Sequence, residues 1–403
     1  MATTLKPADP NQLRDMVLFM ASKKTPAEIV GAGTKRGLGR PLDLDYRIET
    51  GALAGIDLYE PEELVMRAGA GTRLAHIERA LETHRQQLAF EPIDYGPLLG
   101  EPAGKASIGG VFACNLSGPR RVKAGAARDH LLGFVAVSGR GETFKSGGRV
   151  VKNVTGYDLC KLMAGSWGTL AVMEQVTFKV LPAPEATATL LIQGLDDRRA
   201  IRLLTLALQS PHEVSGAAHL PAGIGAGAAA ADIAGPATLL RLEGVPPSVE
   251  ARVAALGELI GGDGIDILDG AASLAIWRAL RDVLPFAGQA DRPVWRLSVP
   301  PAAGAGVVAA IGAQLPAEAY YDWGGGLIWL MLDRRADAGA GLIRAAVGDV
   351  GGHAMLVRAT PEVRASVPVF EPQDRAVGGL TRRIKEGFDP VGILNPGRMY
   401  AGV

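Results

Sequence analysis

Two glycine-rich stretches contain the residues best suited to holding a ligand. The longer one, GKASIGGVFACNLSGPRR from Gly104 to Arg121, has almost no bulk before Phe112. The shorter one, GAGTKRG, runs from Gly31 to Gly37. Glycine has no Cβ, so the backbone can approach a ligand closely, and successive backbone N–H groups can bind an anion. Two such stretches in one chain predict a long, phosphate-bearing cofactor held at two places.

Neighbouring residues exclude two common phosphate-binding motifs. A dinucleotide-binding fingerprint needs Gly or Ala where Arg36 stands, and residues 37–41 cannot open the helix that would carry the pyrophosphate. A Walker A loop needs glycine at Leu99 and Ser or Thr at Ala106. The remaining hypothesis is a pyrophosphate held by loops between strands, with Lys35 or Arg36 adding charge. For the Gly31 loop alone, an ordinary glycine turn is the alternative.

Hydrophobic spacing predicts the elements that must position these loops. Asp9 and Pro10 give a helix start, because an acceptor at the cap precedes proline in the first turn. A short strand at 28–30 enters the Gly31 loop, and Thr72 opens a helix. Alternating or apolar runs predict further strands at 42–48, 64–68, 132–137 and 169–180.

The sequence changes character after Leu181-Pro-Ala-Pro184, where we expect a boundary. Beyond it, short helices and strands are mixed, which predicts a second α+β domain. The Ala/Gly-rich segment 223–235 is interpreted as a hairpin loop. Helices are expected at 196–209, from the Ser248 cap, at 272–283, 336–347 and 374–385, and strands at 187–192, 217–220, 238–242, 294–299, 319–322, 327–332 and 353–358.

Composition limits the class of protein. The chain has 403 residues, which allows two or three domains, and its 42 basic and 42 acidic residues give no general attraction to nucleic acid. Cys114 and Cys160 lack metal or disulfide spacing and are interpreted as buried free thiols. No signal peptide and no membrane-spanning run is found. We therefore expect a cytoplasmic protein, with any membrane association made through partners.

Four motifs in order resemble the vanillyl-alcohol-oxidase and p-cresol-methylhydroxylase (PCMH) type of FAD-binding family. They are GAGTK, the Gly104–Arg121 stretch, KNVTGYDLCKLMAGSWGTLAVMEQVTFKVLP and DPVGILNPGR. VWRLSVP, YDWGG, GGHA and NPGRMY narrow the resemblance to the FAD-binding E subunits of bacterial glycolate oxidase, also called glycolate dehydrogenase. The resemblance implies an α+β flavoprotein with a PCMH-type FAD-binding domain at 1–184, built from two α+β subdomains. It further implies an α+β cap domain at 185–373 and a C-terminal segment, 374–403, that returns to the FAD domain.

The resemblance also implies which residues bind FAD. The first loop would bind the pyrophosphate, the second would line the flavin and pyrophosphate, a residue after Gly168 would give backbone hydrogen bonds, and the NPG terminus would lie near the flavin. In this sequence these positions are Gly31, Ala32, Gly33, Thr34, Lys35, Ser107, Ile108, Gly109, Gly110, Asn115, Gly118, Val172, Asn395 and Arg398.

Two departures from related proteins sharpen the expectation. Members that attach FAD covalently through the first loop have histidine where Thr34 stands, so we expect non-covalent FAD. Related 2-hydroxy-acid dehydrogenases have a metal-binding HxGxGNxH-like pair, whereas the C-terminal half here has only His212, His219 and His353, unpaired. Without a metal to acidify the substrate hydroxyl, we expect no metal site here and no glycolate oxidation by the isolated subunit.

The resemblance therefore implies a heteromeric complex that oxidises glycolate, a small 2-hydroxy acid, to glyoxylate. A sister flavoprotein subunit and an iron–sulfur subunit would accompany this chain, which would hold FAD for assembly and electron transfer. The alternatives are a self-sufficient FAD-dependent oxidase or dehydrogenase of another small alcohol or hydroxy acid, and a subunit that keeps FAD only as structure.

Weaker candidates remain for local chemistry. His353 is a candidate base or carboxylate ligand, with a structural histidine as the alternative, and Arg296 could meet a carboxylate, the flavin or Asp322. Trp323 could cover the flavin or fill core, and the pair Arg120 and Arg121 could neutralise pyrophosphate, face a partner or be solvated. We expect Tyr157 and Asp158 to brace the FAD domain.

Overall fold

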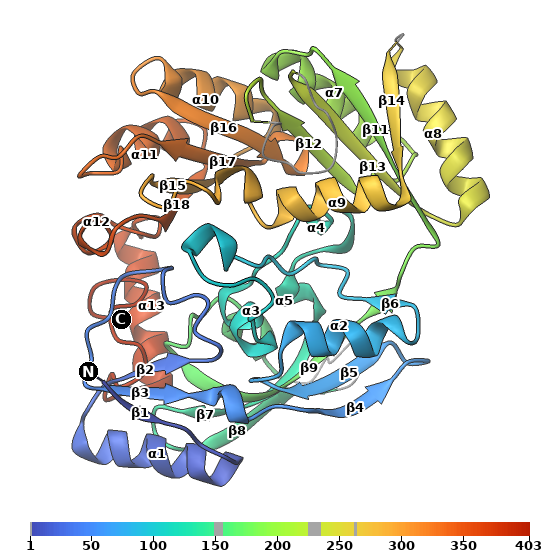
Figure 1. The fold of residues 1–403 in the computed structure, drawn as a ribbon. Helices are drawn as coiled ribbons and strands as arrows, with labels where there is room; N and C mark the ends of the chain where they lie inside the picture. Colours follow the sequence, from blue (N-terminus) through green and yellow to red (C-terminus); the bar gives the residue numbers. More distant parts are fainter. Residues whose placement is uncertain (1, 149–155, 225–234, 262–263) are drawn as a thin grey trace.

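The computed structural model describes residues 2–148, 156–224, 235–261 and 264–403. Two layers of sheet structure lie one above the other, with helices between and around them (Figure 1). The sheets of the N-terminal region (residues 2–182) form one layer, and a single sheet of the central region (residues 186–358) forms the other. Among the described residues, no helix is long and apolar enough to cross a membrane.

The N-terminal region has a small parallel sheet and a larger antiparallel one. The small sheet has the order β1-β3-β2, with β1 Thr3–Leu5, β2 Ala27–Val30 and β3 Tyr46–Glu49. The larger sheet has the order β4-β5-β9-β7-β8, with β4 Ile56–Glu60, β5 Val65–Gly69, β7 Leu131–Ser138, β8 Thr143–Gly147 and β9 Ala171–Lys179. A two-stranded pair, β6 Gln86–Gln87 and β10 Leu181–Pro182, lies near the passage to the central region.

Helix α1 shows why this region folds as it does. The Asp9 side chain accepts from the Gln12 N–H at 2.9 Å and Pro10 follows, so the start is capped as the sequence predicts. Leu13, Val17 and Met20 are fully buried on one face. The helices of the region are α1 Pro10–Lys23, α2 Leu74–Glu82, α3 Ile108–Cys114, α4 Arg121–Ala124, α5 Ala127–His130 and α6 Leu159–Met163, with short 3-10 turns at η1 Thr50–Ala52 and η2 Pro97–Leu99.

The central region is one eight-stranded sheet of order β14-β11-β13-β12-β16-β17-β15-β18. Its pairs are all antiparallel. The strands are β11 Ala186–Gln193, β12 Gly216–Leu220, β13 Ala237–Gly244, β14 Ile265–Asp269, β15 Val294–Ser298, β16 Ala317–Asp322, β17 Leu327–Leu332 and β18 His353–Arg358.

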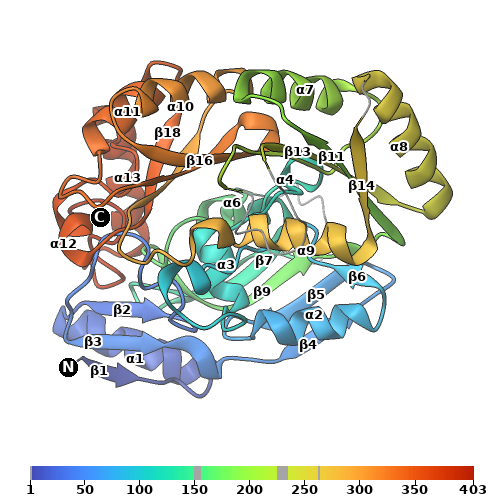
Figure 2. The same cartoon turned by 45° about the horizontal axis from the view of Figure 1, so that its top comes forward.

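Helices cover the two sides of this sheet unequally. Figures 1 and 2 show α7, α10 and α11 on the outer side and α9 between the sheet and the N-terminal region. The described helices and 3-10 turns are α7 Asp197–Gln209, α8 Pro246–Ile260, α9 Gly270–Arg281, η4 Leu284–Phe286, η5 Pro301–Ala303, α10 Gly304–Gly312, η6 Trp323–Gly325, α11 Ala340–Gly348 and α12 Pro361–Ser366.

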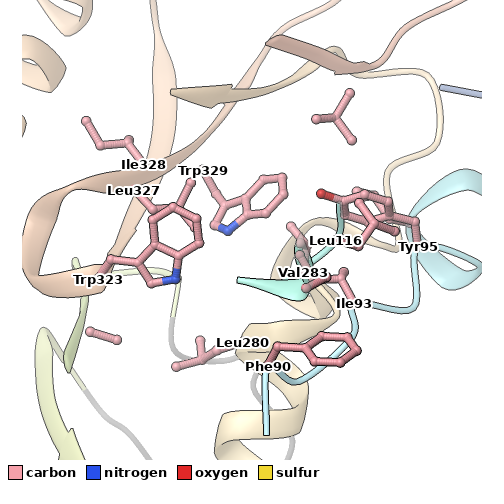
Figure 3. Close-up of a cluster of buried hydrophobic side chains, with 14 of the residues drawn as sticks. Phe90, Ile93, Tyr95, Leu116, Leu280, Val283, Trp323, Leu327, Ile328 and Trp329 are labelled. Carbon is pink, nitrogen blue, oxygen red and sulfur yellow. The ribbon is translucent and has the colours of Figure 1, made fainter. Parts of the chain in front are cut away.

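A hydrophobic core joins the two layers. Side chains of the N-terminal region, among them Phe90 and Tyr95, pack with Trp323 and Trp329 of the central region (Figure 3). The Tyr95 and Trp329 rings meet edge to face with centroids 6.0 Å apart. Trp323 is 7% exposed, and its Nε1 donates to the Gly118 carbonyl at 3.1 Å. Trp323 therefore fills this core, which is one of the two roles predicted for it from the sequence.

The chain finally returns to the N-terminal region. Helix α13, Arg375–Phe388, precedes a tail in which Leu394 forms a parallel bridge with Ala27, the first residue of β2. Leu394 is fully buried in a core with Leu13 and Val172. The C-terminal tail thus packs against the strand that leads into the Gly31 loop.

Most predicted elements are present, but several predictions were wrong in detail. Residues 108–114, expected to lie in a glycine-rich loop, form α3. Of the strand expected at 42–48, only Tyr46–Ile48 belongs to β3. Helix α8 begins at Pro246, because proline at the first helical position needs no N–H partner, and Ser248 does not cap it. Helix α11 begins at Ala340. The predicted loop at 223–235 lies almost wholly outside the described residues.

Candidate functional site

A pocket open to solvent lies where the Gly31 loop, helix α3, the loop before β9 and the C-terminal tail meet. Strand β2 delivers the loop, and Asn395 fixes the strand: its Oδ1 accepts from the Ile29 N–H at 2.7 Å, and its Nδ2 donates to the Trp167 carbonyl at 2.8 Å. Eleven predicted cofactor residues line the pocket: Gly31, Ala32, Gly33, Thr34, Lys35, Ser107, Gly109, Gly110, Val172, Asn395 and Arg398.

The loop after β2 is shaped for close approach of an anion. A Cβ on Gly31 would stand 2.5 Å from the Ser107 Oγ, and Gly33 has a φ of +80°, which other residues rarely adopt. Residues 31–40 form turns and no helix, as the sequence predicted. The N–H groups of residues 32–35 have no hydrogen-bond acceptor among the described residues. These donors are available to a phosphate group.

The positive charge of the loop is divided unequally between two side chains. Arg36 Nε lies 2.9 Å from Glu28 Oε1, and Arg47 Nε lies 2.9 Å from Glu28 Oε2. Burial raises the pKa of the Glu28 carboxyl, but the two guanidinium groups outweigh burial and hold the pKa below its ordinary value. Arg36 is therefore already paired with a carboxylate, which leaves Lys35 as the unpaired cation of the loop.

Lys35 is that cation. Its Nζ has one hydrogen bond, to the Thr34 hydroxyl at 3.4 Å, and no carboxylate of the described residues forms an ion pair with it. Burial lowers the pKa of the ammonium group, while Cys114 and Asp94 oppose the change. An ammonium group beside a row of free N–H donors fits a pyrophosphate, so the residues present fit the cofactor that the motifs imply.

Arg398 acts behind the loop. Its Nη2 donates to the carbonyl of Lys35 at 2.9 Å and to that of Arg36 at 3.3 Å. Burial lowers the pKa of the guanidinium, and Cys114 and Glu28 oppose the change. Arg398 therefore lines the pocket and also holds the loop by two of its backbone carbonyls.

Three predicted cofactor residues do not line this pocket. Ile108 is fully buried in the hydrophobic core. Asn115 ends α3 with a φ of +50°, and its Oδ1 accepts from the Arg128 N–H at 3.0 Å. Gly118 accepts from Trp323, and a Cβ there would stand 2.7 Å from the Glu91 carbonyl. The structure gives these three residues packing and hydrogen-bonding roles.

Sequence reasoning missed several lining residues, of which Cys114 is the most telling. The thiol is free, as predicted, but it is only partly buried, whereas Cys160 is both free and buried. Burial raises the pKa of Cys114 to about 11, against the opposing effect of Lys35. Cys114 lies in the pocket wall because residues 108–114 form a helix, which the sequence did not predict. The other missed residues are Glu28, Ile29, Val30, Thr50, Ala70, Ala113, Trp167, Gly168, Ala171 and Met173, whereas Arg36, predicted as a source of charge, does line the pocket.

Arg120 and Arg121, adjacent in the longer glycine-rich stretch, make different contacts in the structure. Arg120 Nη2 lies 2.8 Å from Glu243 Oε1 and 3.3 Å from Glu91 Oε1, so Arg120 belongs to a buried ionic network and not to the pocket. Arg121 lies over the Trp323 ring, with 4.3 Å from its Cζ to the ring centroid. Neither residue lines the pocket.

The weaker catalytic candidates lie on the central sheet. Arg296 is half-buried on β15, and His353 is exposed at the start of β18. Asp322, considered as an ion partner for Arg296, has no ion pair with it, although the two charges attract. Tyr157 is 92% exposed, so the expectation that it braces the fold was wrong. The first residues of the third motif, 152–155, lie outside the described residues.

Comparison with known proteins agrees with this geometry. Residues 1–147 match the family model described as an FAD binding domain. The chain is 36% identical over 393 residues to glycolate oxidase subunit GlcE of Escherichia coli, which covers 96% of this chain and 97% of the relative. A shorter match, 35% identical over 142 residues, covers 34% of this chain and 28% of a D-lactate dehydrogenase of Anaerostipes hadrus.

Solved structures share the fold. The 4-ethylphenol oxidase of Gulosibacter chungangensis has a TM-score of 0.72 and 13% identity, covering 99% of this chain and 89% of that one. For p-cresol methylhydroxylase the TM-score is 0.70 at 13% identity, covering 98% and 88%. The predicted PCMH-type α+β fold is thereby confirmed. The full-length match shows that this FAD-binding oxidoreductase belongs to the family of the glycolate oxidase subunit GlcE.

Proposed function

We propose that this chain is the FAD-binding subunit of a multi-subunit glycolate oxidase that converts glycolate to glyoxylate. The observation that carries the proposal is the match to subunit GlcE over 96% of the chain. The pocket supports it, because loop, helix and tail all contribute residues that fit a pyrophosphate-bearing cofactor. The complex would also contain a sister flavoprotein subunit and an iron–sulfur subunit, to which this subunit is bound in the cytoplasm.

The cofactor-binding roles follow from the contacts described. The N–H groups of residues 32–35 and the Lys35 ammonium would bind the pyrophosphate, and Arg398 and Asn395 position that loop. Gly110 would let the cofactor lie against α3. Bound FAD would supply a two-electron carrier for electron transfer within the complex. Thr34 has no nucleophilic ring nitrogen, so we propose that FAD is held without a covalent bond.

The proposed domains are an FAD domain of residues 1–184, a cap of residues 185–373 and a returning segment of residues 374–403. The division is supported by the change from one set of sheets to the other between Pro182 and Ala186. It is also supported by the bridge between Leu394 and Ala27. In this arrangement the cap sheet faces the FAD domain across the core that contains Trp323 and Trp329.

Co-purification from the native host tests the proposal. We expect FAD at one per chain, released into the supernatant by acid, with a second flavoprotein and an iron–sulfur protein in the same fraction by mass spectrometry. Flavin that stays with the acid-precipitated chain would contradict non-covalent binding. Glycolate turnover by the isolated subunit at the rate of the complex would contradict a role limited to holding FAD and transferring electrons.

A self-sufficient oxidase of another small alcohol or hydroxy acid is the second candidate. Arg296 and His353 favour it, because both lie on the sheet face that looks toward the N-terminal region. Anaerobic addition of a substrate panel to the isolated, FAD-loaded subunit separates the two functions. Bleaching of the flavin by a single substrate without partners would favour the second.

A further inference from the structure

Three polar side chains share one face of the central sheet. Ser298 of β15 pairs with His353 of β18, and Arg296 lies two residues from Ser298, so all three point to the same side. Trp329 pairs with Arg296 across β17 and therefore also lies on this side. Because Trp329 meets Tyr95 of the N-terminal region, the three polar side chains face that region.

Arg121 reaches this face from the opposite layer. Its Cζ lies 4.3 Å from the centroid of the Trp323 ring, and the Arg296 Cζ lies 5.1 Å from the same ring. The Trp323 Nε1 is tied to the Gly118 carbonyl, three residues before Arg121. One fixed indole thus brings together two guanidinium groups from segments 175 positions apart, each favoured by the ring face.

The charge of this cluster is not balanced. Within the described part of the chain neither Arg121 nor Arg296 forms an ion pair, whereas Arg120, only one residue earlier, meets two carboxylates. Burial and the Arg296 charge both lower the pKa of Arg121. Burial and both arginine charges also lower the pKa of the His353 imidazole, against the effect of Glu371. Such mutual repulsion is relieved when an anion binds between the groups.

The nearby acid does not supply that anion. Asp322 is 2% exposed, and its Oδ1 accepts from the Trp323 N–H at 2.7 Å. Burial raises the pKa of this carboxyl to about 7, more than its hydrogen bond and the arginines lower it. Asp322 is therefore only partly ionised at neutral pH and is turned to the backbone.

The cluster lies beside the FAD pocket. The Trp167 ring, which lines the pocket, meets the Phe370 ring edge to face with centroids 5.1 Å apart. The next residue, Glu371, accepts from the N–H of Ala354, the neighbour of His353, at 2.8 Å. Arg121 and His353 are exposed and Ser298 is half-buried, so a small solute can reach the cluster.

We propose that Arg121, Arg296, Ser298 and His353 form a binding site for the carboxylate of a small 2-hydroxy or 2-oxo acid, next to the flavin. A planar guanidinium presents paired donors that match a carboxylate, and the hydroxyl and imidazole add partners for a neighbouring oxygen. The inference rests on the proposed function, since it takes the flavin to lie in the pocket. The proposed site would let this subunit bind a small organic acid in addition to FAD.

Binding of a redox-inert probe to the FAD-loaded full-length chain tests the site. We expect oxalate to bind one-to-one in calorimetry and to perturb the flavin absorption spectrum, whereas uncharged ethylene glycol at equal concentration does neither. Arg296→Met and Arg121→Met should each weaken oxalate binding at least tenfold, and Arg296→Lys should weaken it less. Arg202→Met is the matched control: it removes the same charge from exposed Arg202 of α7, on the outer side of the sheet, and should leave binding unchanged.

Two results would overturn the site. One is an FAD-loaded chain that binds no oxalate, or binds it equally well in both methionine variants. The other is binding heat without any change in the flavin spectrum, because the anion would then lie away from the flavin. A chain that retains no FAD contradicts the proposed function instead, and its fold is checked by circular dichroism before the titration.

Discussion

Adjacent glycines of α3 differ in what a side chain would meet. A Cβ on Gly109 would stand 2.7 Å from the Ala70 Cβ and 2.8 Å from the Ala70 carbonyl, which cannot move without the strand end that carries it. A Cβ on Gly110 would stand 3.4 Å from the Ser107 Oγ and 3.6 Å from the Lys35 Nζ, an ordinary contact. The absence of a side chain at Gly109 therefore allows close packing against Ala70. At Gly110 it leaves room in the pocket next to Lys35.

Gly110→Ala should separate binding from folding. Alanine suits a helix better than glycine, so the variant should unfold at the wild-type temperature or slightly above it. Its methyl group would occupy pocket space beside Lys35, so we expect FAD affinity to fall about tenfold, measured by titration of the apoprotein with FAD.

Gly109→Ala is the contrasting variant. Overpacking against Ala70 typically costs about 1–3 kcal/mol, so we expect its apoprotein to melt several degrees lower. A Gly110→Ala protein that binds FAD as tightly as the wild type would exclude α3 from the cofactor wall.

At the scale of elements, one helix fixes the tail against the pocket. The Lys385 Nζ of α13 donates to the Thr169 carbonyl at 2.7 Å, the Leu394 carbonyl at 2.8 Å and Asp389 Oδ2 at 2.7 Å. The Asp389 side chain is fully buried and also accepts from the Ile393 and Leu394 N–H groups. This buried ion pair joins α13, the tail and the loop before β9.

Lys385→Met should loosen this whole arrangement. It leaves the Asp389 carboxylate buried without its cation, and breaking such a pair costs about 3–5 kcal/mol. We expect a loss of this size in urea unfolding and weaker FAD binding, because Asn395 and Arg398 lie on the same tail. Arg382→Met on the exposed side of α13 is the control and should change stability by less than about 0.5 kcal/mol. Equal effects of the two substitutions would contradict the role of Lys385.

The elements also show what sequence could and could not predict. Asp9 and Pro10 define the start of α1 locally, and the prediction was confirmed. Helix α3 was missed because two glycines in its first turn lower helix propensity, and tertiary packing of Val111 and Phe112 overrides that preference. The tail motif indicated that Asn395 belongs near the cofactor, but only the fold shows that it joins β2 to Trp167.

At the scale of the whole molecule, four buried charges join the two layers. Glu91 and Arg120 come from the N-terminal region, and Arg241 and Glu243 come from β13. Arg241 Nη1 lies 2.8 Å from Glu91 Oε1, and Arg120 donates from Nε and Nη2 to Glu243 at 2.8 Å each. Glu91 and Arg241 lie 150 positions apart in the sequence, and Arg120 and Glu243 lie 123 positions apart. No local sequence pattern could therefore have paired them. For this reason the sequence alone left Arg120 as a candidate for neutralising a pyrophosphate.

This network makes stability sensitive to acid. Burial raises the pKa of the Glu243 carboxyl, but Arg241 and Arg120 outweigh burial and hold the pKa at about 2, below the ordinary 4.5. The folded state thus favours the ionised form, so this contribution is fully present above pH 4.5. It is lost progressively as the pH falls from 4.5 toward about 2.

Glu243→Gln should therefore lower the melting temperature most at pH 7 and progressively less toward pH 3. At pH 7 the variant leaves Arg120 without its two-point carboxylate partner, and the expected loss is about 3–5 kcal/mol. At pH 3 the wild type has lost part of the same stabilisation, so the two melting curves should approach each other. Glu250→Gln on the exposed side of α8 is the control and should follow the wild type at each pH. A constant difference between Glu243→Gln and wild type from pH 7 to 3 would show that packing, and not charge, holds the two layers together there.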